Sequence, residues 1–117
     1  MIAPALEKFL LVAAADDWVH FAELIFDVRE QEPEIGEAAI HDRAIEVAED
    51  LAKRGLWRAG NVTAAGFSAW SATPEEASRR MREGLRLLGR PVWPGDVCWF
   101  EVTPHGLATL RRHEEEA

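Results

Sequence analysis

Two stretches decide the fold: residues 48–57, AEDLAKRGLW, and residues 99–106, WFEVTPHG. In the first, a helical pattern runs to Lys53 and Arg54 and meets Gly55, a typical helix end with basic side chains at the negative end of the helix dipole. The second begins with strand-forming residues and continues into Thr-Pro, a frequent helix start. We therefore predict a helix that leads into a strand at the first stretch, and a strand that leads into a helix at the second.

Hydrophobic spacing predicts the elements around these two stretches. We expect helices over residues 4–15, from an Asp16-Asp17 cap to about residue 29, and over 37–54, then a strand over 56–62 and a Gly/Ser/Ala loop to residue 71. The sequence TPEE at 73–76 has the pattern of a capping box and predicts a helix over 73–89. A second strand over 96–102 and a last helix from residue 103 complete a single α+β domain, residues 1–117.

This order of elements resembles the winged helix-turn-helix fold. Residues 48–57 resemble the exit of a recognition helix into the first wing strand, and residues 99–106 resemble the second wing strand entering the final helix. The resemblance implies three N-terminal helices, a two-stranded antiparallel wing and a C-terminal helix, with the third helix entering the DNA major groove. The chain departs from that pattern because an insertion over about 63–95, which includes a helix, separates the two wing strands.

The charge of the chain lies in its first half. The formal net charge is −8, and residues 1–54 carry all of it, since residues 55–117 hold as many acids as bases. The helix predicted over 37–54 has five acids against three bases, so it does not supply the phosphate neutralisation on which DNA affinity rests. Its carboxylates form either a solvated face or an acidic surface for a basic protein partner. The candidate binding residues there are Asp42, Glu46, Glu49 and Asp50.

A basic stripe marks the helix of the wing insertion. Arg79, Arg82 and Arg86 recur at helical spacing, and residues 73–90 hold five Arg against three Glu. Either these Arg residues pair within their own helix or with the acidic first half, or they bind an acidic patch of a partner or the DNA backbone. Phe67 and Trp70, in the loop before the helix, are the candidate exposed aromatic anchors beside them.

Catalytic patterns are lacking. The four His residues have no metal-ligand spacing, and the single Cys98 excludes an internal disulfide. We expect no enzyme activity, no metal site and no cofactor. The apolar block over residues 9–15 follows Glu7-Lys8 and no positively charged segment, so we expect a helix there instead of a cleaved signal, and a cytoplasmic protein that does not bind membranes.

We therefore predict a non-catalytic protein-interaction module on a winged-helix scaffold. A concrete form is an antagonist or immunity-type protein that masks a basic bacterial toxin or nuclease. The alternative is a DNA-binding transcriptional regulator that contacts DNA through the basic stripe and Arg58. Because the first helix is apolar, a homodimer is an open alternative to a monomer.

Overall fold

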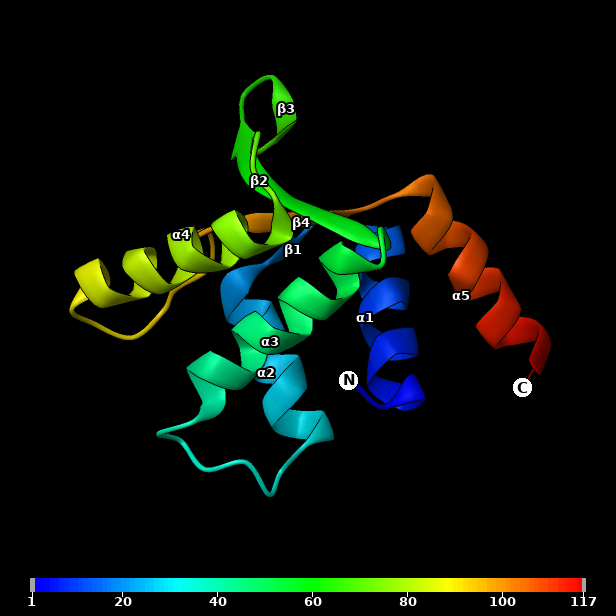
Figure 1. The fold of residues 1–117 in the computed structure, drawn as a ribbon, viewed down its shortest axis with the longest axis horizontal. Coiled ribbons are helices and arrows are strands. Elements are labelled where there is room, and N and C mark those ends of the chain that lie inside the picture. The colour runs from blue at the N-terminus through cyan, green and yellow to red at the C-terminus, as the bar shows by residue number, and fades with distance from the viewer. Residues whose placement is uncertain (1, 117) are drawn as a thin grey trace.

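The computed structural model describes residues 2–116, and this part of the chain contains five helices and four strands (Figure 1). No helix within it combines the length and the apolar character that crossing a lipid bilayer requires. In chain order the elements are α1 (Pro4–Asp16), β1 (Val19–His20), α2 (Phe21–Gln31), α3 (Ile40–Lys53), β2 (Trp57–Thr63), β3 (Gly66–Ala69), α4 (Pro74–Leu88), β4 (Trp99–Val102) and α5 (Pro104–Glu116).

The four strands form one antiparallel sheet in the order β1-β4-β2-β3. Phe100 of β4 is paired with Val19 of β1 on one side and with Ala59 of β2 on the other. The helices α1, α2 and α3 gather on one side of this sheet, and α4 and α5 lie at opposite ends of the molecule (Figure 1). The α+β prediction is confirmed, and so is the antiparallel pairing of the strands predicted over residues 56–62 and 96–102, of which residues 57–60 and 99–102 pair.

The start of the second helix was predicted wrongly. Residues 19–20 form strand β1 where a helix was expected, because their pairing with β4 takes the backbone into the sheet. The helix α2 begins two residues later, and its cap is His20, whose Nδ1 accepts a hydrogen bond of 3.0 Å from the backbone N–H of Glu23. A pairing with a strand some eighty residues away has no local signal in the sequence.

The predicted loop before α4 also contains a strand. β3 pairs with β2 in a hairpin that closes between Thr63 and Gly66, so a short hairpin precedes the inserted helix. The strand predicted from residue 96 begins only at Trp99, because Asp96 stabilises a turn. Its carboxylate accepts a hydrogen bond of 2.8 Å from the backbone N–H of Trp93 and forms an ion pair of 2.7 Å with Arg90. Likewise α3 begins at residue 40, after a turn over residues 36–39.

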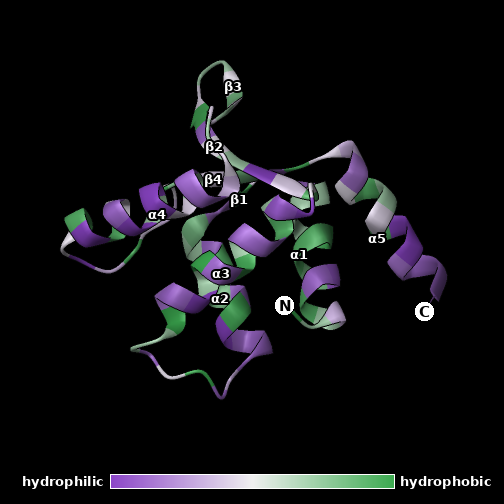
Figure 2. Cartoon of the chain, in the orientation of Figure 1, coloured by the Kyte–Doolittle hydropathy of each residue, from purple (hydrophilic) through white to green (hydrophobic). Residues whose placement is uncertain are grey.

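The core lies between α1, α2, α3 and the sheet. Trp57 is stacked on Phe100 with ring centroids 4.4 Å apart, and its indole N–H donates to the backbone carbonyl of Ala48 at 3.1 Å. Trp57 and Phe100 are both buried, as are most of the apolar residues on the inner sides of the three helices. Figure 2 shows that α4, by contrast, presents mainly hydrophilic residues in this view.

Some apolar residues of the helices and strands are not buried. Phe9 of α1 is 46% exposed, although it belongs to the apolar block of that helix, and Leu107 of α5 is also exposed. Trp18 and Trp99 are half-buried, because Trp18 precedes the helix and Trp99 alternates with buried Cys98 and Phe100 along the strand. An aromatic or aliphatic side chain at helical spacing is therefore not always on the packed face.

The two stretches that decide the fold contact one another. The Thr103 hydroxyl donates a hydrogen bond of 2.5 Å to the Gly55 carbonyl. The backbone N–H of Thr103 donates another, of 3.0 Å, to the Leu56 carbonyl. Gly106 then passes so close that a Cβ there would lie 2.0 Å from the Leu56 oxygen. The end of α3 and the start of α5 thus form one joint.

Candidate interaction surfaces and an aromatic hollow

The predicted acidic surface of α3 is neutralised within the molecule. Each of its four candidate carboxylates has a basic side chain within ion-pair distance. The pairs are Asp42–Arg82 at 2.6 Å, Glu46–Arg43 at 3.3 Å, Glu49–Lys53 at 3.5 Å and Asp50–Arg54 at 2.7 Å. An external basic partner would therefore compete with a partner already present for every one of these carboxylates.

Arg43 also ties α3 to the end of α2. Its guanidinium binds both oxygens of Glu32, at 2.7 and 2.9 Å, in a largely buried, two-pronged contact. The hydrogen bonds to Arg43 lower the pKa of the Glu32 carboxyl. This pair has the geometry of a structural contact and leaves little of either charge for a ligand.

The basic stripe of α4 is divided among several contacts. Arg82 reaches α3 through Asp42, Arg86 pairs at 2.6 Å with Glu83 of its own helix, and Arg79 is exposed. Glu75, at the start of α4, lies 3.5 Å from Lys53 of α3. The structure thus brings the acidic helix and the basic helix side by side, and two of the three stripe residues are engaged inside the chain.

The two predicted aromatic anchors are half-buried. Phe67 is stacked near Trp18 with ring centroids 6.3 Å apart, and the Arg58 guanidinium lies 5.7 Å from its ring centroid. Trp70 packs against the core, and the Arg80 guanidinium lies 4.0 Å from its ring centroid. Both rings are used mainly in packing the hairpin and α4 against the body of the molecule.

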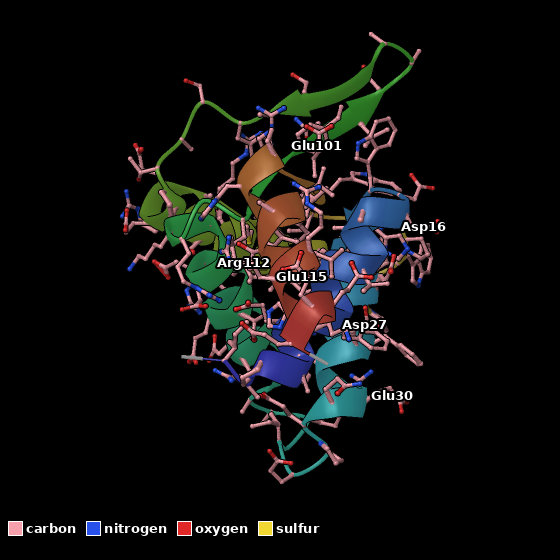
Figure 3. All side chains as sticks on the ribbon, turned by 90° about the vertical axis from the view of Figure 1, so that its right-hand side faces the viewer. Asp16, Asp27, Glu30, Glu101, Arg112 and Glu115 are labelled. Atoms are coloured by element: carbon pink, nitrogen blue, oxygen red, sulfur yellow. The ribbon has the colours of Figure 1, made fainter. Side chains whose placement is uncertain are left out.

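Sequence reasoning missed the acids that remain without a basic partner. In the described part of the chain, no ion pair engages five acids at the end of α1, directly after it, and on α2: Asp16, Asp17, Glu23, Asp27 and Glu30. Figure 3 shows Asp16, Asp27 and Glu30 along one side of the molecule. Unpaired negative charge therefore lies on α1 and α2 and not on α3, and it lies also at Glu34, at Glu76 and at residues 114–116 of α5, which form no ion pair among the described residues.

Exposed apolar side chains lie on the same helix faces as these acids. On α1, Phe9 and Val12 precede Asp16 by seven and four residues, and on α2, Phe26 precedes Glu30 by four, so each set shares one helix face. The three apolar side chains are 46%, 48% and 57% exposed, in chain order. We call these two helix faces together the α1–α2 face. Its accessible residues are Phe9, Val12, Asp16, Glu23, Phe26 and Glu30, and Asp27 lies buried at its edge.

Asp27 is the most unusual residue of the α1–α2 face. It is only 5% exposed, and its Oδ2 atom is buried without a hydrogen-bond partner among the described residues. Burial, and then the nearby Glu23 carboxylate, raise the pKa of Asp27 from 3.8 to about 6. The sequence does indicate the burial of Asp27, because this residue lies three positions after Leu24 and one before Val28. That spacing puts its carboxyl at the edge of the packed face of α2.

A separate hollow of about 180 Å³ lies where β2, α3 and α4 meet. Its walls include the rings of Trp57, Trp70 and Phe100, and Met81 of α4, and Glu49 and Arg58 are its charged lining residues. The indole nitrogen of Trp70 is buried and has no hydrogen-bond partner within residues 2–116. A buried donor without an acceptor is uncommon in folded proteins.

Other chemistry is sparse in residues 2–116. No three His, Cys, Asp or Glu side chains there are grouped so as to hold a metal ion. Burial raises the pKa of the Cys98 thiol, which makes it a poor nucleophile. Comparison of the chain with protein-family models, with curated proteins and with solved structures finds no match.

Proposed function

We propose that this chain is a non-catalytic protein-interaction module that binds a basic partner through the α1–α2 face. One observation carries the proposal: the carboxylates of this face have no ion-pair partner in the described chain, whereas those of α3 are all paired. The proposal keeps the type of partner expected from the sequence and moves its site from α3 and α4 to α1 and α2.

The composition of the α1–α2 face supports such a role. Exposed aromatic and aliphatic side chains together with charged ones are the residue types that protein interfaces combine in an apolar centre and a charged rim. Phe9, Val12 and Phe26 supply exposed apolar side chains. Lys8 lines the surface beside Phe9 and Val12, while the acids farther along the same helix faces, Asp16, Glu23 and Glu30, favour a partner surface rich in Lys and Arg. An amphipathic basic helix of a toxin or nuclease has this chemistry. A cytoplasmic location belongs to the same proposal.

The winged-helix reading of the fold is likewise a proposal. Three N-terminal helices, the antiparallel pairing of β2 with β4 and the C-terminal α5 support it. The hairpin strand β3 and helix α4 are then an insertion within the wing. DNA binding is a weaker reading, because Arg58, Arg82 and Arg86 each have a carboxylate at 2.6 Å.

The proposal is tested by nuclear magnetic resonance titration with an amphipathic helical peptide of Lys and Leu. We expect saturable shifts confined to α1 and α2, and no such shifts with a Glu and Leu peptide. The double variant Phe26→Ala/Glu30→Lys is expected to weaken binding at least tenfold. Its matched control, Leu87→Ala/Glu83→Lys, changes an exposed apolar residue and an exposed acid of α4.

Two results contradict the proposal. One is a set of peptide-induced shifts on α3 or spread over the whole surface, which indicates non-specific attraction to an acidic protein. The other is equal weakening by the α2 variant and by the α4 control. Affinity capture from the native cell with the same two variants then identifies the natural partner, which the α2 variant should lose and the control retain.

A further inference from the structure

We propose that the outer edge of β3 pairs with β3 of a second copy of this chain and forms a symmetric homodimer. The surface is separate from the α1–α2 face, and this inference does not depend on the proposed basic partner. The place of β3 in the sheet, its backbone directions, its side-chain sizes and its lack of charge all favour a second copy as the occupant.

β3 lies at one edge of the sheet, and β1 lies at the other. β1 has only two residues and follows Asp16 and Asp17, so it offers little edge to another strand. Charged side chains and proline usually protect a strand edge, and the four residues of β3, Gly66–Ala69, include neither. The hairpin of β2 and β3 also extends beyond the helices (Figure 1 and Figure 3), which makes its outer edge accessible.

The backbone groups of β3 point alternately to β2 and to the outer edge. The Trp70 N–H, directly after the strand, donates to the Ala59 carbonyl of β2 at 3.0 Å. Since hydrogen-bonded pairs alternate along an antiparallel ladder, Ser68 likewise bonds to β2, and the N–H and C=O groups of Phe67 and Ala69 point outward. In the described part of the chain no strand pairs with this edge.

These outward groups are complementary to the same groups of a second copy. A two-fold axis beside Ser68 places Phe67 of each copy opposite Ala69 of the other, and each such pair exchanges both of its N–H···O=C bonds. The same register sets a large side chain opposite a small one, so the two fit together. The Phe67 ring leaves the edge clear, because it lies over Gly60 of β2, where an added Cβ would come within 2.7 Å of it.

Charge also favours contact at the hairpin. Each copy has a formal net charge of −8, so two copies repel one another as whole molecules. Residues 59–74, which include β3, hold no charged side chain and form the longest uncharged stretch of the chain. Two copies can therefore meet here without bringing like charges together. The short β1 strands then lie at both ends of the joined sheet, so assembly stops at two copies.

Sedimentation velocity on the full chain, up to about 1 mM, measures the self-association. We expect a reversible equilibrium between monomer and dimer, with no larger species. Ser68→Lys sets two like charges opposite one another at the axis and should weaken the dimer about fivefold. Ala69→Pro removes an outward N–H from each copy and should weaken it at least tenfold. The matched control is Asn61→Lys, which makes the same change of charge at an exposed position of β2 and should dimerise like the wild type.

Hydrogen exchange at low and high protein concentration locates the interface. The amides of Phe67 and Ala69 should exchange quickly in dilute protein and become protected as the dimer forms. The amide of Ser68 bonds to β2, so it should be protected at both concentrations. Its protection in each variant also shows that the hairpin is folded.

Three results in folded protein would overturn the inference. A chain that stays monomeric up to about 1 mM leaves the edge to a strand of a different protein. A dimer that neither Ser68→Lys nor Ala69→Pro weakens, or that leaves the amides of Phe67 and Ala69 unprotected, has its interface elsewhere. Equal weakening by Ser68→Lys and Asn61→Lys indicates an effect of charge that is not specific to the edge.

Discussion

Arg82 of α4 donates a hydrogen bond to Asp42 of α3, with 2.6 Å between Nη1 and Oδ1, and so joins the two charged surfaces that the sequence had placed on separate elements. Both side chains are about half exposed or more. An exposed pair of this kind contributes little to stability, but it fixes how much charge each helix shows to solvent. The acidic helix and the basic helix thereby screen one another.

A double-mutant cycle on this pair should give a small coupling. Asp42→Asn, Arg82→Gln and the double variant are compared by urea unfolding followed by tryptophan fluorescence. We expect a coupling free energy of about 0.5 kcal/mol that shrinks as salt is added, since solvent screens exposed charges. A coupling of several kcal/mol, or one that does not respond to salt, would contradict the description of this pair as a surface contact.

The wild-type chain should not bind duplex DNA, even at about 50 mM salt where phosphate contacts are strongest. The reason is that Arg82 and Arg86 are engaged with Asp42 and Glu83, and the neighbouring α3 carries carboxylates. Fluorescence anisotropy with a labelled duplex measures this directly. Binding with a steep salt dependence, lost in the triple variant Arg79→Gln/Arg82→Gln/Arg86→Gln, would instead support the DNA-binding regulator.

Asp27→Asn should raise stability more at high pH than at low pH. Because the pKa of Asp27 is about 6 in the folded chain and 3.8 as an ordinary carboxyl, folding is penalised once the group is charged. The penalty is small below pH 4 and grows until the pH has passed 6. Between pH 5 and pH 8 the free energy of unfolding of the variant should therefore gain about 1 kcal/mol relative to the wild type.

Urea unfolding at these two pH values measures that gain. Val28→Ala, a neutral change in the core of the same helix, is the control, and its effect should be the same at both values. A difference between Asp27→Asn and wild type that does not change with pH would show that the Asp27 carboxyl is not penalised by burial.

Two glycines in helices should respond to alanine in opposite ways. Gly106→Ala should destabilise the fold by about 3 kcal/mol, because the new Cβ would lie 2.0 Å from the Leu56 oxygen and force the joint between α3 and α5 apart. Gly84→Ala in α4 places its Cβ 3.7 Å from Val97, which is ordinary contact, and should stabilise by about 0.5 to 1 kcal/mol. Thermal unfolding of both variants gives the comparison; equal effects would show that the joint is not tight.

The parts of the fold that were predicted correctly are those with local signals. The capping box at Thr73 and Glu76 is present as expected, with both hydrogen bonds formed, because its donors and acceptors lie within four residues. The strands β1 and β3 were missed, since Val19 joins the sheet only through a partner eighty-one residues away, and Gly66–Ala69 has little intrinsic strand preference.

For the candidate binding surfaces too, the sequence predicted the local features but not the contacts between distant residues. Charge counting located the acidic half of the chain, and helical spacing located the Arg stripe, but neither could show that Arg82 reaches Asp42 or that Lys53 reaches Glu75. Which carboxylates remain unpaired is a property of the packed helices. The aromatic hollow depends likewise on alanines from several elements meeting opposite Trp70, which no single stretch of sequence records.

The central place of β4 in the sheet has a consequence for how the chain is made. β4 pairs with both β1 and β2, yet the ribosome synthesises it only after both of them and after α4. Until residues 99–102 emerge, β2 has one open edge, and Trp57 lacks the ring of Phe100 on which it stacks. A nascent chain stalled before β4 therefore exposes an unpaired strand and a bare indole, which are features that recruit chaperones and promote aggregation.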